Sequence, residues 1–177
     1  MLLGANDAVL PMEGTWQHVP IDEYEKNLEA IITHPHIEAH KPKKILLVTP
    51  PPLDEIKSTK LDVADGFPCS VRQAAVSAAY GQRVRDIAGR HDNVVLIDLY
   101  KALMDEAINK SPEDYNRGGP LLGTPENGKS GYLEVLLPDG LHTAGEAYRI
   151  FYDILHPHIN WADHPWVLPD WNDFKPK

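Results

Sequence analysis

The chain has 177 residues, 42% of them hydrophobic, a size that suits one domain with its own hydrophobic core. Its formal net charge of -9 argues against nucleic acid or an anionic membrane surface as the main partner. The single cysteine, Cys69, excludes an internal disulfide, no apolar run could span a bilayer, and MLLGANDAVL lacks the basic region of a signal peptide, so we expect a cytoplasmic protein.

Hydrophobic spacing predicts the elements of the first half of the chain. Apolar residues recur at helical intervals from Ile21 to Ile32, directly after Pro20, and predict an amphipathic helix. The short apolar run 45–48 stops at three prolines and predicts a buried strand of the kind found in parallel sheets. The Ala-rich stretch 71–89 predicts a second helix.

The second half of the chain repeats this order. Residues 93–100, NVVLIDLY, predict another buried strand, and residues 101–110 predict a short helix. Residues 111–131 are rich in glycine and proline and predict a long loop, followed by a last helix over 143–155. Alternating strands and helices indicate an α/β fold, in which helices cover a parallel sheet and functional residues follow the carboxyl ends of the strands.

An acid and a base stand directly before the last helix, in the stretch LLPDGLHTAGEAY. Thr143 and Glu146 have the spacing of a capping box, which would start the helix at about Thr143. Asp139 precedes His142 by three residues, so its carboxylate can reach the imidazole Nδ1-H and turn Nε2 outward, as in a nucleophilic hydrolase. Gly140 lets the backbone bend for this reach. The alternative is structural, with Asp139 forming a turn and His142 half-buried before the helix.

A second candidate motif is GAND, which follows the apolar start of the chain. If Leu2 and Leu3 end a strand, Asn6 lies at the carboxyl edge of the sheet, where its amide NH2 can face a developing oxyanion. The alternative for this motif is a plain turn that ends a strand.

Together the two stretches resemble the Gly-x-Asn-Asp and Asp-x-x-His blocks of the SGNH (GDSL) hydrolases. The stretches PIDEYEKNLEAII, ILLVTPPPLDE, VVLIDLY and LPDW are similar to one branch, the isoamyl acetate-hydrolysing esterases and their fungal and plant relatives. The resemblance runs over nearly the whole chain, in the order of the family. It implies a flavodoxin-like, three-layer α/β/α fold and hydrolysis of small, acetate-type esters without a cofactor or metal.

The resemblance also assigns roles to single residues. Asp139 and His142 match the acid and the base of the family, and Asn6 matches a donor of the oxyanion hole. Gly4 and Asp7 match positions that shape the turn around this donor.

The chain departs from the family at the nucleophile. The family's serine lies in a Gly-Asp-Ser block before the Asn block, whereas no Gly-Asp-Ser occurs in this sequence and only three residues precede GAND. Among the residues present, Ser70 is the first candidate to replace the nucleophilic serine, and Cys69 is a further one. Because loss of the serine from a triad removes about six powers of ten in turnover, we expect this chain alone to be an inefficient esterase. The alternative function is a pseudoenzyme or short isoform that binds a ligand or partner.

The simplest interpretation of the missing block is a chain that starts late, at an internal Met. The strand that ends at Leu3 would then lie at an open edge of the sheet, and such edges pair with other chains, so we expect possible homo-oligomers.

The remaining signals concern metal binding and domain limits. Two His-rich runs suggest zinc, but prolines interrupt both runs and no Cys accompanies them, so we expect surface residues and no metal site. We expect a hydrolase domain over 1–160 and a Trp- and Pro-rich tail over 161–177 that packs on it. The histidines of the two runs are His34, His36, His40, His156, His158 and His164. Three tryptophans of the tail, Trp161, Trp166 and Trp171, would anchor it or line an acyl pocket.

Overall fold

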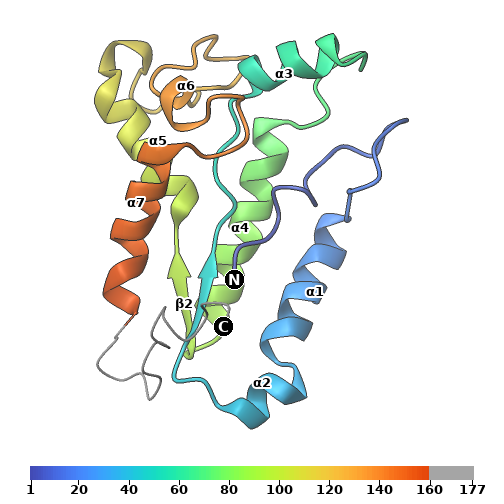
Figure 1. The fold of residues 1–177 in the computed structure, drawn as a ribbon, viewed down its shortest axis with the longest axis vertical. Helices are drawn as coiled ribbons and strands as arrows, with labels where there is room; N and C mark the ends of the chain where they lie inside the picture. The colour runs from blue at the N-terminus through green and yellow to red at the C-terminus, as the bar shows by residue number, and fades with distance from the viewer. Residues whose placement is uncertain (160–177) are drawn as a thin grey trace, which may run out of the picture.

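The computed structural model describes residues 1–159 and places two parallel strands between layers of helices (Figure 1). Strand β1 (Ile45–Val48) pairs with β2 (Val94–Ile97) in parallel register. On the other side of β1, Leu2 forms an isolated parallel bridge with Val48, and the Val48 amide donates to the Met1 carbonyl at 2.9 Å. Residues 1–3 therefore extend the sheet by a single bridge and do not form a full strand.

Helices fill the connections between these segments. The helices are α1 (Ile21–Ile32), α2 (Pro35–His40), α3 (Glu55–Ala64), α4 (Ala74–Arg90), α5 (Leu99–Lys110), α6 (Leu133–Leu136) and α7 (Gly145–Leu155), with 3-10 turns at η1 (Pro112–Asp114) and η2 (His156–His158). Helices α1 and α4 cover one side of the strands and α5 and α7 cover the other, while α2 lies beyond one end of the strands and α3 and α6 beyond the other (Figure 1).

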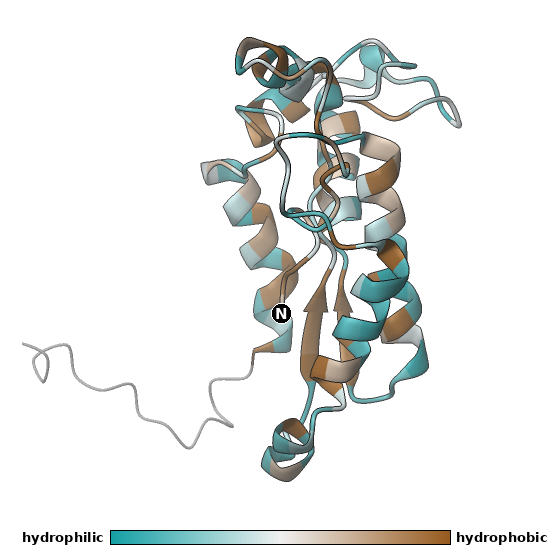
Figure 2. Ribbon diagram, turned by 90° about the vertical axis from the view of Figure 1, so that its right-hand side faces the viewer, coloured by the Kyte–Doolittle hydropathy of each residue, from teal (hydrophilic) through white to brown (hydrophobic). Residues whose placement is uncertain are grey.

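Alternate side chains of each strand enter two separate hydrophobic clusters, because successive side chains of a strand point to opposite faces. Leu47 and Val94 pack in the cluster with α1 and α4. Val48 and Ile97 pack in the cluster with α5, α6 and α7. Burial on both faces explains why both strands are hydrophobic along their whole length (Figure 2). The prediction of an α/β fold with helices on both faces of a parallel sheet is confirmed.

Several predicted boundaries were wrong because polar side chains cap helices nearby. The second strand ends at Ile97 and not at Tyr100, because Asp98 caps α5 by accepting from the Lys101 amide at 3.0 Å. Helix α4 begins at Ala74, three residues later than predicted, and the Glu55 carboxylate accepts from the amide of this first residue at 2.7 Å. The sequence also gave no signal for α2, α3 and α6, which are short or bury few residues.

The predicted capping box of the last helix was also wrong. Helix α7 begins at Gly145, after Ala144, and no side chain caps it. The Glu146 carboxylate instead accepts from the Tyr132 hydroxyl at 2.7 Å. This bond ties α7 to the end of the loop 111–131, which contains only the turn η1 and otherwise has no helix or strand.

The predicted tail 161–177, with Trp161, Trp166, Trp171 and His164, lies outside the described residues, so its packing on the domain is still a prediction. In the part that is described, none of the helices combines the length and apolar character needed to cross a membrane.

We predict that Leu28→Ala lowers the free energy of unfolding by about 2–5 kcal/mol, because truncating a buried leucine leaves a cavity. Leu28 lies on α1, is 1% exposed and packs between α1 and α4. The matched control is Leu61→Ala on α3, where the side chain is 47% exposed and we expect a change within about 0.5 kcal/mol. Urea denaturation of both variants measures the difference, and equal losses would contradict the assigned core.

Candidate active site

The two sequence motifs meet at one pocket of about 320 Å³. Its walls include Asn6 from the N-terminal turn and His142 from the segment before α7. Most other wall residues are apolar, among them Leu2, Leu99, Leu141 and Phe151. The fold therefore brings the predicted donor and the predicted base, 136 positions apart in the chain, to one opening at the carboxyl ends of the strands.

A larger hollow of about 690 Å³ lies on the other side of the N-terminal turn, against α1 and α2. It shares Leu3 and Asp7 with the smaller pocket, and its other lining residues include His34 and His36. No described residue of this hollow forms an acid–base pair like the one at the smaller pocket, where we therefore place the candidate chemistry.

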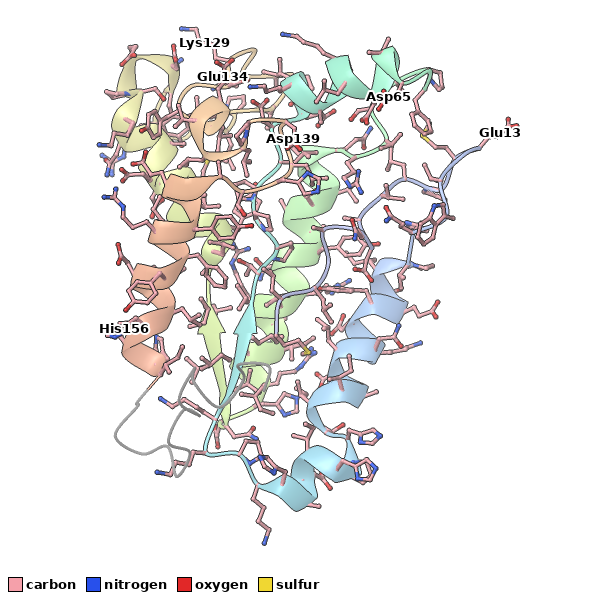
Figure 3. The ribbon with its side chains drawn as sticks, viewed as in Figure 1. Glu13, Asp65, Lys129, Glu134, Asp139 and His156 are labelled. Carbon is pink, nitrogen blue, oxygen red and sulfur yellow. The ribbon has the colours of Figure 1, made fainter. Side chains whose placement is uncertain are left out.

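Asp139 and His142 form the acid–base pair that the sequence predicts. Their side chains lie 2.6 Å apart, between His142 Nδ1 and Asp139 Oδ2, in the segment between α6 and α7 (Figure 3). An ionised carboxylate only accepts hydrogen bonds, so the Nδ1 carries the proton and Nε2 is the nitrogen that can take another. The His142 side chain is 80% exposed, which leaves Nε2 accessible from the pocket.

The Asp139 carboxylate holds its negative charge strongly. Partial burial opposes this charge, but hydrogen bonds from the His142 side chain and from the His142 and Leu141 amides outweigh it, so the pKa falls from 3.8 to about 2. The two amides donate to Oδ1 at 2.7 and 2.9 Å, while Oδ2 faces the imidazole. One carboxylate thus forms the turn and orients the base at the same time.

Gly140 fits this turn tightly against the N-terminus of α3. Its φ is +86°, and a Cβ there would lie 2.6 Å from the Asp54 carbonyl oxygen and 2.8 Å from the Ser58 amide. The Asp54 amide donates to the Gly140 carbonyl at 2.9 Å, and Asp54 Oδ1 caps α3 through the Lys57 amide. Asp54 was not predicted from the sequence, although PPPLDE marks a turn, because no local pattern links it to position 140.

The N-terminal turn is closed by the two residues predicted to shape it. The Gly4 amide donates to Asp7 Oδ2 at 3.1 Å, and the Ala8 amide donates to the Gly4 carbonyl at 3.0 Å. Gly4 has a φ of +116°, and a Cβ would lie 2.7 Å from the Tyr24 hydroxyl oxygen, which itself donates to the Leu3 carbonyl at 3.0 Å. Only glycine fits between this backbone turn and α1.

Neither candidate substitute for the nucleophile lies at the pocket. Ser70 is buried, and its hydroxyl faces the Arg72 carbonyl at 2.5 Å and Asp62 Oδ2 at 3.2 Å. Cys69 is exposed and is not among the described residues that line the pocket. Those residues include no serine or cysteine, and their side-chain hydroxyls come from Thr143 and Tyr148.

One histidine of the first His-rich run, His34, has a structural role. His34 precedes α2, and its Nδ1 accepts from the His36 amide at 3.2 Å as a helix cap. Within residues 1–159, no three His, Cys, Asp or Glu side chains lie close enough together to hold a metal ion.

The sequence is similar to known ester hydrolases over almost its whole length. Residues 1–155 match the family described as GDSL-like Lipase/Acylhydrolase. The isoamyl acetate-hydrolyzing esterase 1 homolog of Mus musculus is 28% identical over 175 residues, which are 98% of this chain and 60% of the mouse protein. The Homo sapiens homolog is 26% identical over the same shares. An Arabidopsis thaliana GDSL esterase/lipase is 44% identical over 57 residues, 31% of this chain and 23% of that protein. The chain therefore spans about 60% of the length of its mammalian relatives.

We predict that Gly140→Ala destabilises the protein more than Gly128→Ala. Both glycines have a positive φ, of +86° and +77°, but a Cβ at Gly128 would meet no atom within 4 Å. The control should therefore cost about 1–2 kcal/mol from backbone strain alone, whereas Gly140→Ala adds a clash with the backbone of α3. Chemical denaturation of both variants measures the difference. Equal costs would show that the turn is not packed against α3 as described.

We predict a titration midpoint of about 2 for the Asp139 carboxyl, measured by carbon-13 NMR, and a higher midpoint in His142→Ala. The folded pKa lies below the unfolded one, so the ionised pair stabilises the fold above about pH 4 and this contribution is lost as the pH falls through about 2. Asp98 provides the control: partial burial raises its pKa, hydrogen bonds and the Arg85 charge together lower it by more, and His142→Ala should leave its midpoint in place. An unmoved Asp139 midpoint in His142→Ala would contradict the pairing.

Proposed function

We propose that this chain, which belongs to the GDSL-like lipase/acylhydrolase family, carries the base, the orienting acid and one oxyanion-hole donor of a hydrolase of small carboxylic esters. The observation that carries this proposal is the 2.6 Å contact between His142 Nδ1 and Asp139, on a histidine that lines the same pocket as Asn6. A base, its acid and a neutral amide donor at one pocket are the components that acyl transfer needs around a nucleophile.

In the proposed reaction, His142 Nε2 takes the proton of a serine hydroxyl as its oxygen attacks the ester carbonyl carbon. Asp139 stabilises the imidazolium that forms, and the Asn6 amide donates to the oxyanion of the tetrahedral intermediate. The imidazolium then gives its proton to the leaving alcohol, and water, activated by the same base, releases the acid from the acyl-serine. Because the sequence contains no Gly-Asp-Ser block, we propose that the serine comes from outside these 177 residues.

The size and the walls of the pocket favour an ester substrate with a small, apolar acyl or alcohol group. Its volume of about 320 Å³ and its leucine and phenylalanine walls suit short hydrocarbon chains. The mouse and human relatives carry isoamyl acetate in their names, so we propose acetate-type esters for this chain as well.

A second candidate function is a catalytically inactive module that binds a ligand or partner. The absence of a serine or cysteine among the described pocket residues favours it, as does the exposure of Leu2 and Leu3, 42% and 44%, beside β1. Pairing of two copies through this edge of the sheet and a cytoplasmic location are still predictions of the sequence.

We predict that the purified 177-residue chain hydrolyses p-nitrophenyl acetate no faster than its His142→Ala variant. A fusion that places a family member's Gly-Asp-Ser strand before Met1 should gain turnover, and His142→Ala in this fusion should remove about four to six powers of ten of it. Substituting the added serine by Ala is the matched control. Rates measured by absorbance, with folding checked by circular dichroism, decide the outcome.

Two results would contradict parts of the proposal. A folded fusion whose turnover does not depend on His142 would reject this residue as the base. Turnover by the 177-residue chain that His142→Ala abolishes would support ester hydrolysis but place the nucleophile inside the chain.

A further inference from the structure

Arg72 links the segment before α4 to the N-terminal turn, although 66 residues separate it from Asn6. Its Nε donates to the Ala5 carbonyl at 3.1 Å. One terminal nitrogen donates to Asn6 Oδ1 and to Gln17 Oε1, both at 3.3 Å. The guanidinium therefore donates hydrogen bonds both to the backbone of the N-terminal turn and to the side chain of Asn6, the candidate oxyanion donor.

The chemistry of arginine decides which way the Asn6 amide points. A guanidinium has only donors, so the atom of the Asn6 side chain that faces Arg72 must be the oxygen. The NH2 group of the planar carboxamide then points away from Arg72. Asn6 lines the pocket of His142 and Arg72 does not, so a carboxamide held in this way leaves its NH2 free to face the pocket.

The segment that carries Arg72 is itself held in place from two directions. The Val71 amide donates to Asp62 Oδ2 on α3 at 2.9 Å, and the Val71 carbonyl accepts from the Leu10 amide at 2.8 Å. Burial lowers the pKa of the Arg72 guanidinium, and the nearby Asp62 carboxylate opposes this effect. An anchored, charged donor of this kind can restrict a side chain that is otherwise exposed.

We propose that Arg72 is a positioning residue that fixes the Asn6 carboxamide with its NH2 toward the pocket of His142. The value of this orientation for catalysis rests on the proposed function, because only an oxyanion needs a donor there. Without Arg72 the carboxamide can rotate and present its oxygen, which would repel an oxyanion instead of stabilising it.

The direct test is nitrogen-15 relaxation of the Asn6 side-chain NH2 in the 177-residue chain, with its resonances assigned from their loss in Asn6→Ala. We expect Arg72→Met to shift these resonances and to lower their order parameter to below about 0.6, the range of flexible groups. Gln17→Ala is the matched control, since it removes another acceptor of Arg72 but keeps the contact with Asn6, and it should leave the order parameter unchanged.

A second substitution keeps the test decisive if Arg72→Met fails to fold. Arg72→Gln keeps a polar head but is too short to hold both Ala5 and Asn6, so it should give the same loss of order. An unchanged Asn6 order parameter in whichever variant retains a dispersed backbone spectrum would overturn the proposal.

The catalytic consequence is measured separately, in the fusion that carries the added serine. Arg72→Met should lower kcat with little change in KM, by up to the 10²- to 10³-fold that loss of one oxyanion donor typically costs, and Arg72→Lys should restore part of it. An active fusion whose kcat does not depend on Arg72 would overturn the positioning role. A fusion that is inactive with Arg72 in place rejects the proposed function, while the relaxation measurement still judges Arg72.

Discussion

The parallel pairing of β1 and β2, with residues 1–3 bridged to β1, is the constraint on which the site depends. Parallel strands end at the same edge, so the turns that follow them meet there whatever their distance in the chain. Burial of the strands on both faces fixes their register, because a slip by one residue would exchange the two hydrophobic clusters. The Asn6 turn follows residues 1–3, and the loop after β1 holds the His142 turn at the same edge through the hydrogen bond from the Asp54 amide to the Gly140 carbonyl.

Local hydrogen bonds shape the turn in each half of the site. Asp139 accepts from two backbone amides and one imidazole, and Asp7 accepts from the Gly4 amide. In both turns the carboxylate binds groups two or three residues away, and a glycine with positive φ makes the reach possible. The hydrogen bonds within each turn join sequence neighbours, while contacts with α3, with α1 and with Arg72 fix where each turn lies in the fold.

The sequence could predict features that depend on neighbouring residues, but not contacts between residues far apart in the chain. The α/β fold, both strands, the main helices and the Asp139–His142 pair depend on periodicity or on spacings of a few residues. The contacts of Asp54 with Gly140 and of Arg72 with Asn6 join distant positions, and no local pattern marks them. The predicted capping box failed for the same reason, since Glu146 has a distant partner, the Tyr132 hydroxyl, that competes with the local one.

The supports of the site also bear on the nucleophile. The His142 imidazole is held by Asp139, the Asp139 turn by α3, and the N-terminal turn by α1 and Arg72, all within the described residues. None of these contacts uses a serine side chain at the pocket, so the placement of His142 and of the Asn6 turn does not depend on a nucleophile there. In a triad, removing the nucleophile abolishes turnover while the oxyanion donors and the binding pocket keep their share of transition-state stabilisation. If the proposed roles hold, a serine delivered to this pocket would meet an imidazole that Asp139 already orients and a turn that Arg72 already holds.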